Sequence, residues 1–231
     1  EGALRPSDAV LEGSCLQNEF AADATTPTFL VAGDSHAQQL MAPLLVLADE
    51  NNWGVISLLK GGCPLGVGAP AWSASGPPCD QWRAAALSYA LDVQPDAVYL
   101  VATRATPTGP EAMIEGIDEV VGILTGAGIE VAAVRDTPRF DFDMYLCVLS
   151  EEECAVPEVP ADIDLDRMAA DPRVFAVDFR RWLCPEGMCE GEIGNLAVYI
   201  DDNHLSASYG RTLAPMLSEM LSEADSARGL G

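Results

Sequence analysis

The sequence is poor in basic residues. Among its 231 residues it has one lysine, Lys60, and two histidines, His36 and His204. Its 36 acidic side chains outnumber the 12 lysines and arginines, which gives a formal net charge of −24 at pH 7. Such a surface repels phosphate backbones and anionic lipid headgroups, and this excludes nucleic acid as a partner. The acidity indicates a solvated surface that tolerates salt, and by itself it assigns no function.

Long apolar runs are also absent. A membrane-spanning helix needs about 20 consecutive apolar residues, and the longest apolar helical stretch, residues 40–48, is much shorter. That stretch is typical of a core helix. The first six residues do not have the pattern of a signal peptide. If the protein is exported, its targeting element is expected to lie outside this chain.

Predicted strands and helices alternate along the sequence. Short apolar runs rich in β-branched residues predict strands, and the longer stretches between them predict helices. The strands are predicted at 28–32, 53–59, 97–102, 129–134 and 174–177, with an extended segment at 196–200. The helices are predicted at 36–51, 80–91, 110–127, 163–170 and 205–223. This alternation implies βαβ units with parallel strands and right-handed crossovers, so the fold class is α/β.

The length fits one domain of this class. Residues 1–26 are polar and irregular, and we expect them to form a connector or an N-terminal arm. A single folded domain is expected at 27–225, followed by a C-terminal tail at 226–231. Two long segments are expected to be loops: the stretch 61–78, which is rich in glycine and proline, and the acidic stretch 137–160.

The cysteines indicate the redox compartment. They do not form two CxxC pairs and no histidine lies near them at zinc spacing, so neither a metal site nor a cofactor is expected. Short sequence separations favour the disulfides Cys147–Cys154 and Cys184–Cys189, and Cys63–Cys79 would close a longer loop. Cys15 is then left over: either it is free, or its partner lies upstream of this chain. The pattern favours an oxidising compartment, with seven reduced thiols in a cytosolic protein as the alternative.

Two segments far apart in the sequence carry the candidate chemistry. Ser35 follows the first predicted strand at the turn into a helix, which places its hydroxyl at the carboxyl edge of the sheet. A serine is a weak nucleophile unless a base is adjacent, and that base needs an orienting group. The sequence offers only two histidines as bases. Of these, His204 is the candidate base, and Asp201, three residues earlier, is its orienting carboxylate. Asp202 is the competing orienting group, but adjacent side chains point apart. The alternative for Ser35 is a simple helix cap.

Four further residues are expected to support this site. Asp34 braces the turn before Ser35, and His36 has a structural role beside it. Gly62 follows the second strand and could donate a backbone N–H to an oxyanion, whereas Arg104 ends the third strand and could bind a polar substrate or aid the oxyanion. A plain turn glycine and a surface salt bridge are the alternatives for these last two. Ligands of open parallel sheets bind outside the carboxyl ends of the strands, where all these segments are predicted to converge.

The chain resembles the SGNH hydrolase-like superfamily, because Gly33-Asp34-Ser35 matches its first block and Asp201-x-x-His204 its last. More narrowly, over about residues 28–220, it resembles the SGNH domains fused behind acyltransferase-3 membrane proteins. The motifs that carry this narrower resemblance are Gly33-Asp34-Ser35-His36-Ala37, Cys63-Pro64, Cys79-x-x-Trp82, Leu183-Cys184 and Asp201-Asp202-Asn203-His204-Leu205-Ser206.

The resemblance implies a three-layer α/β/α sandwich with a mainly parallel, flavodoxin-like sheet, and an SGNH catalytic domain at 27–225. It also implies O-acylation, usually acetylation, of cell-envelope carbohydrates or glycolipids outside the cytoplasm. Ser35 would carry the acyl group, His204 would act as acid and base, and Asp201 would orient the imidazole. The acyl donor would come from an acyltransferase-3 membrane domain of the same polypeptide, which would also tether the protein. The acceptor would be an envelope carbohydrate.

One departure and two alternatives accompany this resemblance. The superfamily has an oxyanion asparagine in a GxND block after the third strand, and residues 101–105 have no counterpart to it. Fused SGNH domains often carry an arginine at this point, which Arg104 matches. The first alternative function is a stand-alone carbohydrate esterase, with water as the acceptor. The second is a glycan-binding domain whose triad is vestigial.

Overall fold

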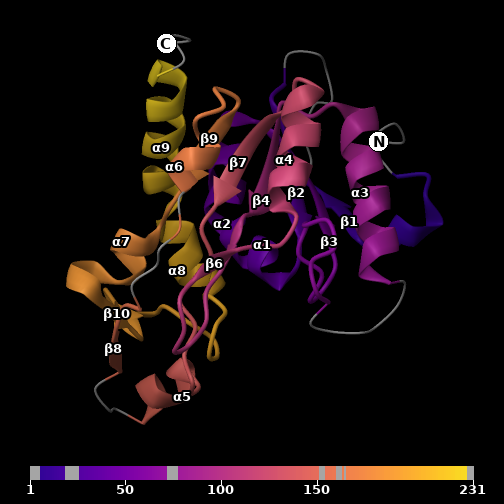
Figure 1. Cartoon of the computed structure of the whole chain (residues 1–231). Coiled ribbons are helices and arrows are strands. Elements are labelled where there is room, and N and C mark those ends of the chain that lie inside the picture. Colours follow the sequence, from indigo (N-terminus) through magenta and orange to yellow (C-terminus); the bar gives the residue numbers. More distant parts are fainter. Residues whose placement is uncertain are drawn as a thin grey trace.

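A six-stranded sheet forms the centre of the molecule. The computed structural model describes residues 6–18, 26–71, 78–150, 154–159, 163 and 165–227. The sheet has the order β1-β3-β2-β4-β7-β9 (Figure 1). Its strands are β1 (Cys15–Gln17), β2 (Thr28–Gly33), β3 (Gly54–Leu59), β4 (Ala97–Val101), β7 (Glu130–Val134) and β9 (Val174–Val177). The last five are mutually parallel, and β1 pairs antiparallel with β3 at the edge. The parallel strands are almost wholly buried, which explains why their sequences are apolar on both faces.

Helices cover both faces of this sheet (Figure 1). The helices are α1 (Ser35–Leu40), α2 (Ala42–Asn51), α3 (Cys79–Val93), α4 (Ile117–Gly126), α5 (Met144–Leu149), α6 (Leu165–Met168), α7 (Arg180–Leu183), α8 (Ala207–Thr212) and α9 (Ala214–Ala227). Two short 3₁₀ turns, Ala9–Leu11 and Pro185–Gly187, complete them. Helices α3 and α4 contact each other, whereas α2 contacts α8 and α9. The three-layer α/β/α sandwich predicted from the sequence is therefore confirmed.

Two predicted helices are each broken into two. The stretch 36–51 forms α1 and α2, which are separated at Met41, two residues before Pro43. The stretch 205–223 forms α8 and α9, and Pro215 is the second residue of α9. Proline has no N–H to donate and its ring clashes with the preceding turn, so a helix tends to restart at such a residue. The break after α1 leaves a short helix that begins at Ser35.

Two other regions also differ from their prediction. The helix expected at 110–127 begins only after Gly116, whose φ of 69° is left-handed and does not continue a helix toward the N-terminus. The expected loop 137–160 contains α5 and a short strand. Helix α5 has a local cause, because the carboxylate of Asp143 accepts a hydrogen bond from the backbone N–H of Leu146 at 2.9 Å.

Short antiparallel ribbons extend the loops at the carboxyl ends of the strands. They pair β5 (Thr103–Arg104) with β6 (Ala112–Met113), β8 (Ala155–Pro157) with β10 (Met188–Glu190), and β11 (Glu192–Ile193) with β12 (Leu196–Ala197). The sequence predicts an extended segment at 196–200, which contains β12, but it predicts neither the other ribbon strands nor the strand β1 within the expected connector. In Figure 1, α5, β8 and β10 lie together below the central sheet.

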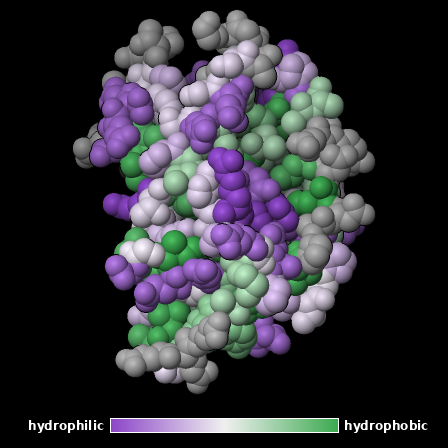
Figure 2. Space-filling model, turned by 90° about the vertical axis from the view of Figure 1, so that its left-hand side faces the viewer, coloured by the Kyte–Doolittle hydropathy of each residue, from purple (hydrophilic) through white to green (hydrophobic). Residues whose placement is uncertain are grey.

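Disulfides hold the long loops. The described residues include the bonds Cys63–Cys79, Cys147–Cys154 and Cys184–Cys189, which are the three pairs expected from the spacing. They fit a domain outside the cytoplasm. No helix in the described ranges combines the length and the apolar character that crossing a membrane would require. Hydrophilic residues cover much of the face on the α9 side of the molecule (Figure 2), in keeping with the acidic composition.

Candidate active site

Ser35 is placed by the turn between β2 and α1. The strand ends at Gly33, and a Cβ at that position would lie 2.8 Å from the Cβ of Ala37, so the close strand-to-helix turn requires a residue without a side chain. Asp34 caps the helix, because its carboxylate accepts a hydrogen bond from the backbone N–H of His36 at 3.0 Å. Ser35 is then the first helical residue, and its side chain stands at the carboxyl end of β2.

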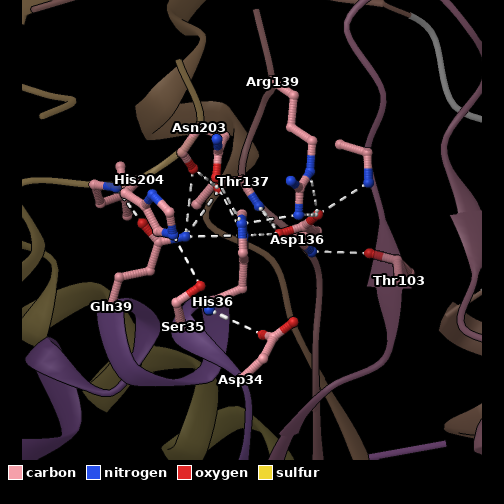
Figure 3. A network of polar contacts seen from close by, with 12 residues as sticks. Asp34, Ser35, His36, Gln39, Thr103, Asp136, Thr137, Arg139, Asn203 and His204 are labelled. Carbon is pink, nitrogen blue, oxygen red and sulfur yellow. Dashed lines mark hydrogen bonds and ion pairs between the residues drawn. The ribbon is translucent and has the colours of Figure 1, made fainter. Parts of the chain in front are cut away.

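His204 contacts Ser35 directly, although 169 positions separate them in sequence (Figure 3). Its Nε2 lies 2.9 Å from the Ser35 Oγ, and its Nδ1 lies 2.7 Å from Oδ2 of Asp201. Since an ionised carboxylate can only accept a hydrogen bond, Nδ1 carries the proton and Nε2 is the free acceptor that faces the hydroxyl. The structure thus brings together all three residues of the predicted triad.

The second oxygen of Asp201 fixes the carboxylate to its own loop. Its Oδ1 accepts hydrogen bonds from the backbone N–H groups of Asn203 at 2.8 Å and His204 at 2.7 Å. Partial burial acts to raise the pKa of Asp201, but these two bonds and the bond to the imidazole outweigh it and lower that pKa. Asp202, the competing orienting group, instead accepts a bond from its neighbour Asn203 at 2.5 Å. The geometry therefore favours Asp201 as the group that orients His204.

His36 belongs to a second polar cluster, packed against the first. Its ring is 4% exposed, and its Nδ1 lies 2.6 Å from Oδ1 of Asp136, which is 2% exposed. Its Nε2 faces the side-chain oxygen of Asn203 at 2.9 Å and the Arg139 guanidinium at 2.8 Å. The rings of His36 and His204 have their centroids 5.0 Å apart. His36 therefore links the loop of the candidate base to a buried carboxylate, as Figure 3 shows.

Asp136 is the buried anion on which this second cluster depends. Besides His36, its carboxylate accepts hydrogen bonds from the backbone N–H of Ala105 at 3.0 Å and from the Arg139 guanidinium at 3.3 Å. Its own backbone N–H donates to the Thr103 hydroxyl at 2.8 Å. Burial alone would raise the pKa of Asp136, but the charges of His36 and Arg139 and the hydrogen bonds lower it well below its usual range.

The cluster continues into a buried ionic network that joins three strand ends. The Thr103 hydroxyl donates to Glu111 at 2.6 Å, and the same carboxylate accepts bonds from Arg180 at 2.8 Å and from Arg135 at 3.1 Å. Arg135 also pairs with Asp178 at 2.9 Å. These residues follow β4, β7 and β9 or lie in the adjacent ribbon. The network therefore holds the carboxyl ends of the three strands in a fixed relation to one another.

The two residues expected to assist an oxyanion lie in loops at the same edge. Gly62 lies in the turn after β3 and has a φ of 69°, which a glycine adopts without strain. Arg104 is the second residue of β5 and is partly buried. Burial and the neighbouring guanidinium of Arg139 lower the pKa of Arg104, while Asp136 and Asp34 act in the opposite direction. Arg104 therefore lies in the electrostatic environment of both clusters, and the roles of both residues in binding or catalysis stay predictions.

Four residues of the site are not predicted from the sequence: Gln39, Asp136, Thr137 and Arg139. A signal for two of them was present. Asp136 and Thr137 follow the predicted strand at 129–134, and polar residues after a buried parallel strand lie at the ligand-binding edge. Gln39 had no such signal, because a glutamine on a helix is ordinarily a solvent-facing residue.

Loss of the buried anion should destabilise the fold. We expect Asp136→Asn to lower the free energy of unfolding by about 3–5 kcal/mol at neutral pH, because the Arg139 and His36 side chains lose a buried charged partner. Urea unfolding measures this difference. Asp141→Asn is the matched control: that carboxylate is exposed nearby on the same loop, and the change should stay within about 0.5 kcal/mol. Equal stability of Asp136→Asn and the parent protein would contradict the role of the cluster.

The same variant has a defined pH dependence. Since the pKa of Asp136 is lowered in the folded protein, its stabilising contribution is complete above the pKa of an unfolded aspartate, about 3.9. The contribution declines as the pH falls from there toward the folded-state pKa. The difference in unfolding free energy between the parent protein and Asp136→Asn should therefore shrink as the pH falls below about 4. A difference that grows as the pH falls below about 4 would contradict this assignment.

An α/β/α sandwich with a Ser–His–Asp hydrogen-bond chain at the carboxyl edge of its sheet is the arrangement of SGNH hydrolase-like proteins. The family model described as "SGNH domain (fused to AT3 domains)" matches residues 5–219, and the chain belongs to this family. By that description, the SGNH domains of this family are fused to AT3 domains.

A solved structure supports the fold. The chain is similar to the periplasmic domain of the lipopolysaccharide acetyltransferase of Salmonella serovar Paratyphi A, with a TM-score of 0.66 and 14% sequence identity. The similarity covers 86% of this chain and 85% of the Salmonella domain. At this level of identity the likeness concerns the fold. No curated protein sequence matches the chain significantly.

Proposed function

We propose that this domain transfers an acyl group, acetyl in the simplest case, to a hydroxyl of a cell-envelope carbohydrate or glycolipid through an acyl-serine intermediate. The observation that carries the proposal is the continuous hydrogen-bond chain from Asp201 through His204 to Ser35. Family membership and the fold shared with a lipopolysaccharide acetyltransferase domain favour a carbohydrate as the acceptor. An extracytoplasmic position fits the three disulfides.

The geometry supports a two-step mechanism. In the first step the Ser35 Oγ attacks the acyl carbonyl while its proton passes to Nε2 of His204, which returns the proton to the leaving group of the donor. In the second step an acceptor hydroxyl gives its proton to the same nitrogen and attacks the acyl-serine, and the proton then returns to Ser35. Asp201 stabilises the imidazolium in both steps. The donor is supplied by an AT3 membrane domain, to which this family's domains are fused.

The developing oxyanion needs hydrogen-bond donors. The asparagine of the superfamily's GxND block has no counterpart, so we assign this role to the backbone N–H of Gly62 together with the Arg104 guanidinium. Arg104 is suited to it because its charge lies at the same strand edge, in the environment of Asp34 and Asp136. Arg104→Lys should lower kcat more than it raises KM, because the donors act on charge present only in the transition state. Steady-state kinetics with 4-nitrophenyl acetate measure both.

Transfer and hydrolysis are distinguished by the product. The protein is incubated with 4-nitrophenyl acetate, with and without an envelope polysaccharide or lipopolysaccharide, and the carbohydrate is examined by mass spectrometry. We expect O-acetylated carbohydrate, and Ser35→Ala should form none. Free acetate as the sole product in the presence of every acceptor would identify the domain as a carbohydrate esterase instead.

A third reading, a glycan-binding domain with a vestigial triad, is tested by chemical labelling. A fluorophosphonate reacts with a serine whose hydroxyl is activated by an adjacent base. Stoichiometric labelling of Ser35 is expected, since the His204 Nε2 stands 2.9 Å from its Oγ. Carbohydrate binding without any labelling would favour the binding domain and contradict the proposed mechanism.

A further inference from the structure

Helix α1 carries more of the site than its first residue. Ser35 and Gln39 are four positions apart, so they lie one above the other on the same face of the helix. Gln38 points elsewhere and is exposed, whereas Gln39 is partly buried. Figure 3 shows the Gln39 side chain directed at the segment that carries His204. The helix that presents the nucleophile therefore also contacts the loop that presents the base.

Gln39 contacts the backbone on both sides of His204, and its Nε2 also lies 2.9 Å from the His36 Nδ1. Its Oε1 accepts a hydrogen bond from the backbone N–H of Leu205, the residue immediately after the base. Its Nε2 lies 3.2 Å from the Thr137 hydroxyl, which in turn donates to the backbone carbonyl of Asn203 at 3.0 Å. The same Nε2 approaches that carbonyl at 3.5 Å. The Gln39 amide thus contacts the backbone of Asn203 and of Leu205, the residues immediately before and after His204.

Other contacts of the loop do not involve the nucleophile's helix. The carbonyl of Asp202 accepts a bond from Phe140 at 2.8 Å, and the carbonyl of Asp201 accepts one from Met144 at 3.3 Å. These bonds anchor the loop to the segment after β7. Residues of α1 supply a second set of contacts, which join the loop to the helix of the nucleophile. Among those, Gln39 bonds to the backbone of the loop and His36 to the side chain of Asn203.

We propose that Gln39 is a positioning residue of the reaction, one that sets the distance between the Ser35 Oγ and the His204 Nε2 through its amide. The inference rests on the proposed acyl-transfer function. Its physical basis is that proton transfer requires the two atoms in hydrogen-bond reach, and that a displacement of about 1 Å can cost about a hundredfold in rate. Gln39 touches no reacting atom and acts only on where the base stands.

The test compares Gln39→Ala, Gln39→Glu and the neighbouring control Gln38→Ala in the full chain. Each variant is titrated with fluorophosphonate to count reactive serines, and kcat and KM for 4-nitrophenyl acetate are then measured per site. Gln39→Ala should lower kcat and the labelling rate by about ten- to a hundredfold with little change in KM. Gln39→Glu keeps the acceptor for the Leu205 N–H, so it should recover part of this loss. Gln38→Ala should match the parent protein.

Thermal unfolding of the same variants separates positioning from simple stability. A lowered Tm with unchanged kcat and labelling rate per site would overturn the inference, because it would show that Gln39 only supports the fold. Ser35→Ala is included so that a failure of the proposed function can be distinguished from a failure of the positioning role of Gln39. Turnover by Ser35→Ala within a few-fold of the parent protein overturns the proposed function, whereas an inactive Ser35→Ala beside a fully active Gln39→Ala overturns the positioning role alone.

Discussion

Ser35→Ala will reduce the turnover of an activated acetyl ester by at least about 10⁴-fold and abolish formation of acylated carbohydrate. The reason is chemical: in the proposed mechanism the acyl group is attached to the Ser35 Oγ, which lies 2.9 Å from the His204 Nε2, and alanine has no such oxygen. Steady-state turnover, fluorophosphonate labelling and the mass of an acyl-enzyme trapped at low pH measure the loss. KM is not a useful measure for Ser35→Ala, because any hydrolysis that remains comes from water that attacks the bound ester directly.

The control for this substitution is Ser222→Ala. Ser222 lies exposed on α9, and its hydroxyl donates to the backbone carbonyl of Ser218 within the same helix. This variant should retain full activity and full labelling. Activity of Ser35→Ala within a few-fold of the parent protein would show that the nucleophile is another group and that the hydrogen bond to His204 is a structural contact.

The parallel sheet was predictable from the sequence because its strands are buried on both faces. The apolar run at 97–102 and the run at 129–134, which only Glu130 interrupts, predict buried strands, and β4 and β7 fall within them. Apart from β12, which lies in the extended segment predicted at 196–200, the short ribbon strands and β1 were not predictable, since strands of two or three residues have no periodicity of their own. They form where tertiary structure brings a partner, as Cys15–Gln17 does beside β3.

Part of the candidate site was likewise predictable from the sequence, and part was not. The meeting of Ser35 and His204 was predictable because the rule that parallel strands present ligands at their carboxyl ends applies to segments far apart in sequence. That rule also applied to Asp136, which follows β7, but the stretch after it was assigned as an acidic loop. The contacts of Gln39 could not be predicted by any sequence rule. They depend on the fold that brings residues 203–205 against α1, and no local pattern encodes such a contact.

The neighbouring residues Asp201 and Asp202 allow a matched test of the orienting group. Asp201→Asn should lower kcat/KM by about 10⁴-fold, whereas Asp202→Asn should stay within about threefold of the parent protein. The two substitutions change the same atoms one position apart, and each removes one negative charge from the loop. A general effect of charge on His204 would therefore appear in both variants. An effect of hydrogen-bond geometry would appear in the first alone.

The geometry of the loop explains why Asp201→Asn is expected to lower kcat/KM so strongly. Oδ1 of Asp201 accepts bonds from two backbone N–H groups, those of Asn203 and His204, so an asparagine must keep its oxygen there. Its NH₂ group is then forced against Nδ1 of His204, which must become an acceptor. The ring proton moves to Nε2, the nitrogen that faces Ser35, and that nitrogen can no longer accept the proton of the hydroxyl. Rates are measured with 4-nitrophenyl acetate and with fluorophosphonate, and a large loss in Asp202→Asn with an active Asp201→Asn would assign the orienting role to Asp202.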